Sequence, residues 1–375
     1  MKCTVDQKEL LSALKIMLNV IPKKTYLPTL TTVLLETSGE SSLILSATNL
    51  ETSIRSTIVA RFTQKGAICI PARHLFEIIK SLPKSVNQIE LELTNTLDFV
   101  IRAGDGIYKI LGIAADEFPT LPVVDFAKIE TIPADIFCDM VRKVEYAVSN
   151  DECRPSSLCG VLWQTSGKQA VIVAINGHEL VEVISKKIQF ATPHVDVIIP
   201  LRPLTILGKL LTKEITEIGV IFEDNNLIFV YGNTTILTRL IEGPYLDYKK
   251  VVSKSKNNDQ IVIINKESLL QALQQLRVSI VDDRNYRTTL MVTKNQLKLS
   301  TKGVTLERPC QFEGKKKIEV AYNINYLINT VEHIDGNEVK FAFKESPNSR
   351  APLRITPTNK NDGHLCLVMP LLENN

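Results

Sequence analysis

The chain has 375 residues, of which 44% are hydrophobic and 23% charged, as is typical of a folded globular protein with two or three domains. No apolar run approaches the roughly 20 residues that span a bilayer, and charged residues interrupt the N-terminal segment. We therefore expect a cytoplasmic protein with no membrane partner. The formal net charge of +3 neither requires nor excludes nucleic acid as a partner.

The same pattern of a strand followed by an amphipathic helix opens each third of the chain. The three copies begin at Lys2, Glu130 and Ile261. A second, similar start lies inside each third, at Ala67, Asp196 and Lys317. A sixfold internal repeat predicts a repetitive, ring-like or stacked object and argues against a single catalytic cleft.

Residues that favour helix starts mark these helices. Asp6 and Glu9 have capping-box spacing, Pro133 suits a first helical turn, and Asn265 can cap the third helix. In the second set, three residues stand where a strand passes into a helix: Pro71, Pro200 and Asn323. The first apolar contacts of those helices are expected four residues later, at Leu75, Leu204 and Leu327.

Between the helices, short runs of alternating or β-branched residues predict antiparallel strands separated by Gly, Asn or Asp turns. We therefore expect an α+β protein with three similar domains, each made of two βαβββ-like halves. Connectors are visible at residues 117–122 and in the polar run 253–260. The predicted domains are N-terminal (1–124), central (125–254) and C-terminal (255–375).

The seven cysteines are scattered and never have C-x-x-C spacing. We interpret them as small, reduced core residues and not as a disulfide framework or a zinc site. They are Cys3, Cys69, Cys138, Cys153, Cys159, Cys310 and Cys366.

No catalytic motif stands out. The chain has no P-loop, no G-x-S-x-G, no H-E-x-x-H and no G-x-G-x-x-G motif. The five histidines have no ligand spacing, and the neighbours His178 and Glu179 would point to opposite faces of a strand. The residues therefore imply no catalytic site, no metal and no cofactor. An enzyme that uses His178 with a distant carboxylate is kept as an alternative.

Seven segments form a distinctive series along the chain. They are LPTLTTVLLE (27–36), LSATNLETSI (45–54), DEFPTLP (116–122), SNDECRPSSLCGVL (149–162), VAINGHEL (173–180), TRLIEGPYLDYKKV (238–251) and LCLVMPL (365–371). In this order they resemble the bacterial sliding clamp, the beta subunit of DNA polymerase III. The resemblance covers the whole chain and implies a head-to-tail homodimeric ring, with helices lining the central hole and antiparallel sheets outside.

The resemblance implies a non-catalytic processivity factor that encircles double-stranded DNA and tethers the replicative polymerase. A sliding ring needs Lys and Arg side chains directed at phosphates and no base-specific contacts. Candidates on or next to predicted helices are Lys8, Lys15, Arg73, Lys80, Arg142, Lys143, Arg202, Lys209 and Arg277, and the family pattern adds Lys24. Each could instead be the solvated face of an amphipathic helix. The last predicted helix, 323–332, has no Lys or Arg.

The resemblance also implies an apolar pocket between the second and third domains, where polymerases, the clamp loader and repair proteins insert short peptides. The matching positions are Leu158, Ile175, Gly177, His178, Leu180, Leu246, Val251, Leu367, Val368, Met369 and Pro370. At the dimer interface, Tyr108 and Ile110 of one subunit would meet Ile280 and Val281 of the other. The alternative is that these residues belong to an ordinary core and a terminal strand.

Some residues depart from the family pattern. Residues 175–179 read INGHE where the family usually has Thr-Asp-Gly-His-Arg, so Glu179 would reverse a charge beside the pocket. Leu246 replaces a common proline, and the chain is not acidic as family members usually are. These departures keep open an alternative: a specialised clamp-like paralogue for repair, for a plasmid or phage, or for inhibitor tolerance.

Overall fold

The computed structural model describes residues 1–149, 155–191, 195–212, 214–281, 286–315, 317–344, 351–359 and 363–371. The chain divides into two compact units. The first unit contains Met1–Ala134 and Arg202–Leu240, and the second contains Asp135–Leu201 and Ile241–Asn375. In the part of the chain that is described, no helix is both long enough and apolar enough to cross a membrane.

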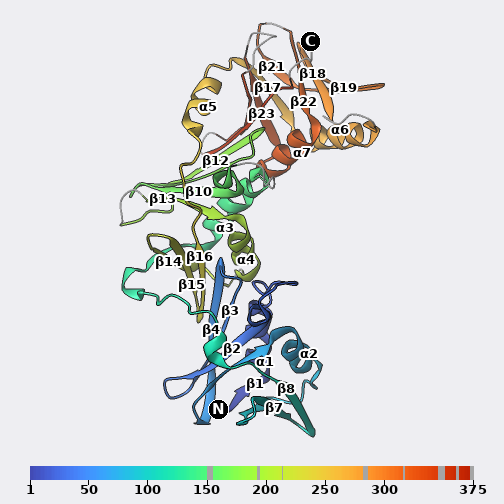
Figure 1. The fold of residues 1–375 in the computed structure, drawn as a ribbon. Coiled ribbons are helices and arrows are strands. Elements are labelled where there is room, and N and C mark those ends of the chain that lie inside the picture. Colours follow the sequence, from blue (N-terminus) through green and yellow to red (C-terminus); the bar gives the residue numbers. More distant parts are fainter. Residues whose placement is uncertain are drawn as a thin grey trace. The chain divides into compact units, whose positions relative to one another are not determined.

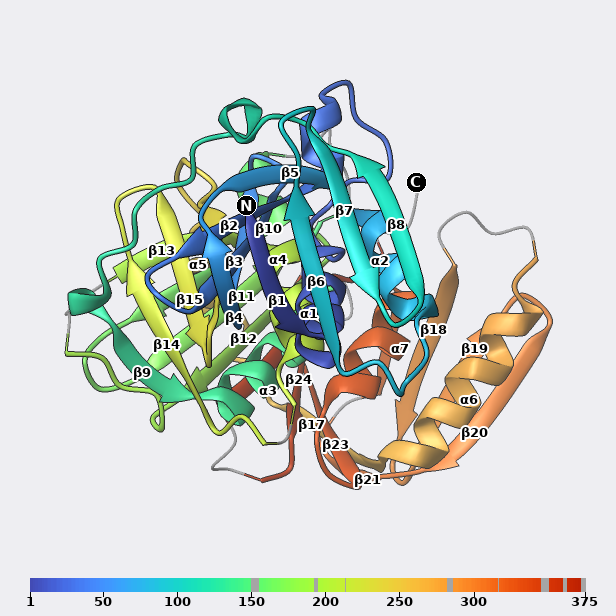
Figure 2. The same ribbon diagram turned by 90° about the horizontal axis from the view of Figure 1, so that it is seen from below.

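All six predicted strand–helix starts are present (Figures 1 and 2). They are β1 (Lys2–Asp6) with α1 (Gln7–Met17), β5 (Ala67–Pro71) with α2 (Ala72–Ser81), β9 (Glu130–Pro133) with α3 (Ala134–Val144), β13 (Val195–Pro200) with α4 (Leu201–Leu210), β17 (Gln260–Asn265) with α6 (Lys266–Ser279), and β22 (Ile318–Asn323) with α7 (Ile324–His333). The transitions at Pro71, Pro200 and Asn323 are confirmed. The expected first contacts Leu75, Leu204 and Leu327 are at most 2% exposed.

Side-chain caps explain where two of these helices begin. Asp6 Oδ1 accepts hydrogen bonds from the backbone N–H groups of Lys8 (2.8 Å) and Glu9 (3.0 Å). Asn265 Oδ1 accepts one from the N–H of Ser268 at 2.9 Å. The first turn of a helix has N–H groups without helical partners, so each cap satisfies donors that would otherwise need water. Both predicted caps are confirmed.

Two element boundaries differ from the prediction. Pro133 is the last residue of β9 and does not lie in the first turn of α3. The helix α5 (Tyr248–Ser255) occupies the start of the run 253–260 that was predicted as a connector. The polar composition of that run hid α5, whose Tyr248, Val251 and Val252 pack against an apolar cluster of the second unit. Burial of this face outweighs the weak local signal.

The first unit contains a 12-stranded sheet. Besides β1, β5 and β9, its strands are β2 (Thr32–Ser38), β3 (Ser42–Thr48), β4 (Thr52–Gln64), β6 (Gln88–Leu93), β7 (Asp98–Ala103), β8 (Gly106–Leu111), β14 (Glu217–Phe222), β15 (Asn226–Tyr231) and β16 (Thr234–Arg239). Figure 2 shows β6, β7 and β8 in succession at one edge. Antiparallel pairing of β4 with β16 joins strands of the first and central thirds of the sequence.

The second unit contains a nine-stranded and a four-stranded sheet. Besides β13, β17 and β22, its strands are β10 (Gly160–Thr165), β11 (Ala170–Ile175), β12 (Glu179–Ser185), β18 (Arg287–Thr293), β19 (Gln296–Thr301), β20 (Val304–Pro309), β21 (Gln311–Glu313), β23 (Glu338–Phe343), β24 (Leu353–Pro357) and β25 (Gly363–Val368). Pairing of β12 with β25 joins the central and last thirds. The two compact units therefore do not follow the three sequence repeats, because strand pairing crosses the repeats.

Candidate functional site

One face of the nine-stranded sheet carries an apolar cluster. Its buried members are Leu158, Leu162, Val173, Ile175, Leu180, Ile198, Tyr248, Leu365 and Leu367. Ile175 lies opposite Leu180, and Leu180 lies opposite Leu367, so three neighbouring strands contribute to one row. The helix α5 packs against this face through Val251 and Val252. The segment before α5 also covers part of the cluster, through Ile241 and Tyr245.

A hollow of about 350 Å³ opens beside this cluster. Its lining residues are Leu162, Gln164, Asp196, Ile198, Gly243, Pro244, Tyr245, Leu246, Asp247, Tyr248 and Lys249. The Tyr248 hydroxyl donates to Gln164 Oε1 at 2.7 Å, and Gln164 Nε2 donates to Asp196 Oδ2 at 3.0 Å. Apolar residues and polar or charged residues both line the hollow, which suits a peptide ligand with both kinds of side chain.

A tight turn between β11 and β12 lies next to the end of β25. Gly177 has a φ of +89°, and Asn176 Oδ1 accepts hydrogen bonds from the N–H groups of His178 (3.0 Å) and Glu179 (2.8 Å). The carbonyl of His178 accepts a hydrogen bond from the N–H of Met369 at 2.9 Å. Two segments far apart in the sequence therefore form one surface.

The structure brings most of the predicted pocket residues together. Leu158, Ile175, Leu180, Val251 and Leu367 belong to the apolar cluster or pack against it. Gly177 and His178 form the turn, Leu246 lines the hollow with 51% exposure, Val368 is buried at the end of β25, and Met369 and Pro370 follow it.

The sequence analysis missed several residues of the hollow: Leu162, Gln164, Asp196, Ile198, Tyr245 and Tyr248. The two tyrosines lie inside the segment TRLIEGPYLDYKKV, whose aromatic residues beside the exposed Leu246 were an available signal. Leu162 and Ile198 gave no distinct signal, because buried strand residues look alike in sequence whether or not they border a hollow.

The predicted charge reversal beside the pocket is wrong. Glu179 is 2% exposed, and its carboxylate accepts hydrogen bonds from Asn176 Nδ2 (2.8 Å) and from the hydroxyl of Thr330 on α7 (3.4 Å). Neighbouring strand residues point to opposite faces, so the side chain of Leu180 lies in the cluster and that of Glu179 on the α7 side. Burial raises the pKa of Glu179 to about 8, so the carboxyl is mostly protonated at neutral pH.

Most of the predicted phosphate-contacting residues are exposed on helices. Lys8 and Lys15 lie on α1, Arg73 and Lys80 on α2, and Arg202 and Lys209 on α4, while Lys24 lies in the loop after α1. Arg277 on α6 is half-buried, and its guanidinium group lies 4.2 Å from the ring centre of Tyr286. Arg142 on α3 is exposed but pairs with Asp139 and Asp335.

Lys143 does not fit this set, and its prediction is wrong. Its side chain is only 7% exposed, and its Nζ atom lies 2.8 Å from Asp139 Oδ2 and 2.6 Å from Asp335 Oδ2. Arg142 and Lys143 are consecutive residues of α3, so their side chains leave the helix in different directions. Arg142 is exposed, whereas the side chain of Lys143 is buried. A buried ammonium group that is held by two carboxylates is not available to phosphate.

The predicted interface residues lie at sheet edges or helix ends. Ile110 on the edge strand β8 is 5% exposed and Tyr108 is half-buried. Ile280 is half-buried directly after α6, and Val281 is 84% exposed. Sequence reasoning missed three exposed neighbours: Ile107 (62%), Leu111 (68%) and Val278 (83%). Exposed apolar side chains at a sheet edge are typical of a surface that pairs with another chain.

The cysteines in the described residues are free thiols: Cys3, Cys69, Cys138, Cys159, Cys310 and Cys366. Cys3, Cys69 and Cys366 are buried, as expected of small core residues. Cys153 lies outside the described residues. Within the same part of the chain, no group of three or more His, Cys, Asp or Glu side chains could hold a metal ion.

Comparison with known proteins gives a match over nearly the whole chain. Residues 1–122, 131–247 and 255–371 match the family models described as DNA polymerase III beta subunit, N-terminal, central and C-terminal domain. The beta sliding clamps of Bacillus subtilis and Pseudomonas aeruginosa are 24% and 26% identical, covering 92% and 99% of this chain and 93% and 100% of theirs.

Solved structures show the same fold. The crystal structure of the DNA polymerase sliding clamp from Bacillus subtilis has a TM-score of 0.92 at 23% identity and covers 100% of both chains. The DNA polymerase III subunit beta from Pseudomonas aeruginosa has a TM-score of 0.90 at 23% identity, covering 99% of this chain and 100% of its own. The predicted α+β fold of three similar domains is confirmed, and the full-length matches do not favour the paralogue alternative.

Proposed function

The chain belongs to the DNA polymerase III beta subunit family, the sliding clamps, and from this premise we propose that it works as a homodimeric ring around duplex DNA. The observation that carries the proposal is the match of all three family domains, in order, along one chain. In this proposal the protein has no catalytic site or cofactor and acts in the cytoplasm as a processivity factor. Domain boundaries near residues 125 and 255 are part of it.

The exposed basic residues support sequence-independent contact with DNA. Lys8 and Lys15 lie on α1, Lys24 lies in the loop that follows it, and Arg73 and Lys80 lie on α2. Flexible, solvated side chains attract phosphates without reading bases, so a duplex can move past them. Escape is then prevented by ring closure and not by tight binding.

The apolar cluster and its hollow support partner docking. A polymerase, clamp loader or repair protein would insert an apolar side chain of a short peptide between Leu246 and the cluster face around Leu162 and Ile198. The tether raises the effective concentration of a weakly bound polymerase at the primer end. The exposed Met369 adds an adaptable side chain close to the β11–β12 turn, which suits several related peptides.

Sedimentation equilibrium tests the ring first. A mass of twice 41.9 kDa that persists on dilution is expected, and a stable monomer would contradict the proposal. The second test loads the labelled protein onto nicked circular DNA with the clamp loader of a relative. The protein should stay bound in high salt and leave when the circle is cut. Equal release from intact circles would contradict topological retention.

A further inference from the structure

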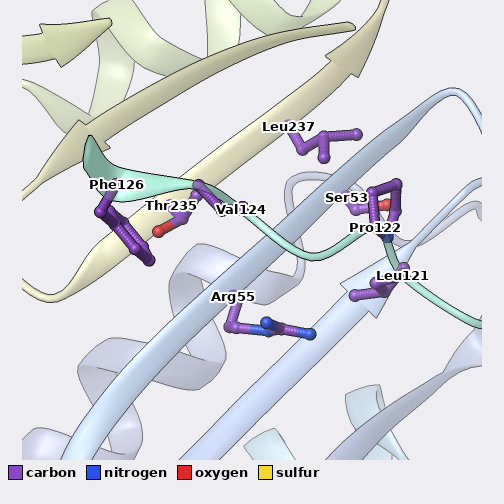
Figure 3. Close-up of a pocket in the computed structure, with 8 residues that line it drawn as sticks. All are labelled: Ser53, Arg55, Leu121, Pro122, Val124, Phe126, Thr235 and Leu237. Carbon is purple, nitrogen blue, oxygen red and sulfur yellow. The ribbon is translucent and has the colours of Figure 1, made fainter. Parts of the chain in front are cut away.

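The loop that follows α1 carries the most exposed aromatic residue in the described part of the chain. Tyr26 is 104% exposed, as much as a tyrosine in an extended peptide, so its ring is not packed into the fold. Phe126, another exposed aromatic residue, is 54% exposed and lines a small pocket where the linker crosses β4 and β16 (Figure 3). Packing explains the position of Phe126, whereas a fully exposed ring such as that of Tyr26 is typical of a residue that contacts a partner.

Both ends of this loop are fixed within the first unit. Ile21 is 2% exposed, and its carbonyl accepts a hydrogen bond from Arg73 Nη2 on α2 at 3.3 Å. At the other end, Pro28–Thr31 forms a 3-10 helix that buries Leu30. A residue held between two fixed ends loses less conformational freedom when it binds, so the entropic cost of using Tyr26 as a contact is low.

The loop is also positively charged. Lys23 and Lys24 directly precede Thr25 and Tyr26, and both lysines are exposed. Residues 10–35 contain three lysines and no Asp or Glu, so this stretch alone has a formal charge of +3, equal to that of the whole chain. A local excess of cations without acidic neighbours in sequence attracts a polyanion.

The combination of cations and an exposed aromatic ring indicates which polyanion the loop fits. Lysines alone are enough for a duplex, because its outer surface offers phosphates while its bases are stacked on one another. An aromatic ring needs an accessible flat face, and an unpaired base offers one next to its phosphates. Proteins that hold single strands combine basic side chains with aromatic rings in this way. A run of Asp or Glu would satisfy the lysines but offers Tyr26 no flat face.

We propose that the loop of residues 22–28 binds single-stranded DNA. The ring of Tyr26 stacks on one unpaired base, and the ammonium groups of Lys23 and Lys24 contact the phosphates beside it. The inference rests on the clamp function proposed above and deepens it: besides the duplex inside the ring, the protein holds a short unpaired stretch of template where the duplex ends. The residues of this loop belong to the first unit and differ from those of the apolar cluster and its hollow.

Fluorescence anisotropy of the full-length protein at low salt tests the proposal. The probe is a short labelled oligothymidine. Its two controls keep the phosphates and remove the accessible bases: an abasic strand of the same length and a duplex. Wild type should bind the oligothymidine about tenfold more tightly than the abasic strand, because only the oligothymidine can stack on the ring. Equal affinity for the two single strands would overturn the proposal.

Variants at two exposed aromatic residues separate stacking from charge. Tyr26→Ala should lower the affinity for oligothymidine about tenfold and leave binding of the abasic strand and the duplex unchanged. Tyr26→Trp keeps a stacking ring and should bind at least as tightly as wild type. Phe126→Ala, outside the loop, is the matched control and should bind as wild type does. Because Tyr26 is fully exposed, Tyr26→Ala should keep the wild-type melting temperature, and full oligothymidine binding by this variant would refute the role of the ring.

A double variant, Lys23→Gln with Lys24→Gln, tests the phosphate contacts. It should weaken binding of both single strands and reduce the salt dependence of that binding. Unchanged binding would contradict the assignment of these lysines. A labelled oligoglutamate is the probe for an acidic protein partner. Binding of oligoglutamate that depends on Tyr26, together with no binding of oligothymidine, would overturn the proposal.

The clamp function is tested separately by the dimer mass and by retention on circular DNA. Tyr26→Ala should pass both of these tests. If it passes them and also binds oligothymidine fully, only the present inference fails. A wild-type monomer that leaves intact circles would instead refute the clamp function, whatever its affinity for the oligonucleotide.

Discussion

Lys143 Nζ on α3 lies 2.6 Å from Oδ2 of Asp335, the residue that follows α7 by two positions. Asp139 accepts the same ammonium group at 2.8 Å, and Arg142 lies 3.3 Å from the other oxygen of Asp335. The network links the matched central region to the matched C-terminal region inside the second unit. It therefore fixes how α3 sits against the end of α7.

Replacing Asp335 by Asn should destabilise the protein. The change leaves Lys143 buried with one carboxylate in place of two, and breaking a buried pair typically costs several kcal/mol. Because Asp335 is about half exposed, we expect a smaller loss, about 1–3 kcal/mol, in urea unfolding at pH 7. Glu77→Gln is the matched control, since its exposed pair with Lys80 at 3.7 Å should contribute less than about 1 kcal/mol.

The effect of Asp335 should depend on pH. Burial disfavours its carboxylate, but the hydrogen bond and charge of Lys143, together with Arg142, outweigh burial and lower its pKa below 3.8. A lowered folded-state pKa stabilises the protein above the unfolded-state pKa, and this contribution is lost as the pH falls through the folded-state pKa. The difference between wild type and Asp335→Asn should therefore shrink below pH 4. A difference that stays constant down to pH 2 would contradict the assignment.

Glu179→Gln should stabilise the protein at alkaline pH. Burial raises the pKa of Glu179 from 4.5 to about 8. Between pH 4.5 and pH 8 the folded state therefore keeps a proton that the unfolded state has released. The unfolded state is then favoured as the pH rises. Glutamine imitates the protonated carboxyl, so the two proteins should have nearly equal stability at pH 4.5, and Glu179→Gln should be more stable by about 4 kcal/mol at pH 8.5.

Chemical denaturation at several pH values measures this effect of Glu179. The exposed Glu40→Gln serves as control and should show no such trend. Equal stability of wild type and Glu179→Gln at both ends of the pH range would contradict the view that this carboxyl is buried and protonated.

Leu246→Ala should weaken partner binding without unfolding the protein. Leu246 lines the hollow but is 51% exposed, so its truncation removes contact with a bound peptide and little core packing. Fluorescence anisotropy with the clamp-binding peptide of a relative's polymerase should show about a tenfold loss of affinity. Leu27→Ala, at a leucine that is 50% exposed in the first unit, should bind normally. Unchanged binding by Leu246→Ala would place the peptide elsewhere.

Val281→Asp should convert the proposed dimer into monomers. Val281 is 84% exposed directly after α6, and a carboxylate there would be buried without a partner if the residue lies in the interface. Sedimentation should show the monomer mass at low micromolar concentration. The control is Val123→Asp, at a linker valine that is 90% exposed, which should remain dimeric. If both variants stay dimeric, Val281 lies outside the interface.

Local patterns were enough to predict the strand–helix repeats and their caps. Asp6 and Asn265 could be identified because a cap depends on residues within one helical turn. The apolar pocket positions were predicted through ordered resemblance, and the structure brings Ile175, Leu180 and Leu367 together by strand pairing. The helix α5 was missed because the packing of one face, and not its polar composition, stabilises it.

The sequence by itself determined the fold class, the threefold repeat and the family, because short periodic patterns and the order of a few segments indicate all three. Only the tertiary structure decided which charges are surface charges. Arg142 and Lys143 are neighbours on α3, yet one is exposed and the other is buried against Asp335. Glu179, which the sequence suggested as a charge beside the pocket, is likewise buried on the α7 side of its strand. Burial and ion pairing depend on residues distant in the chain, and no local pattern records them.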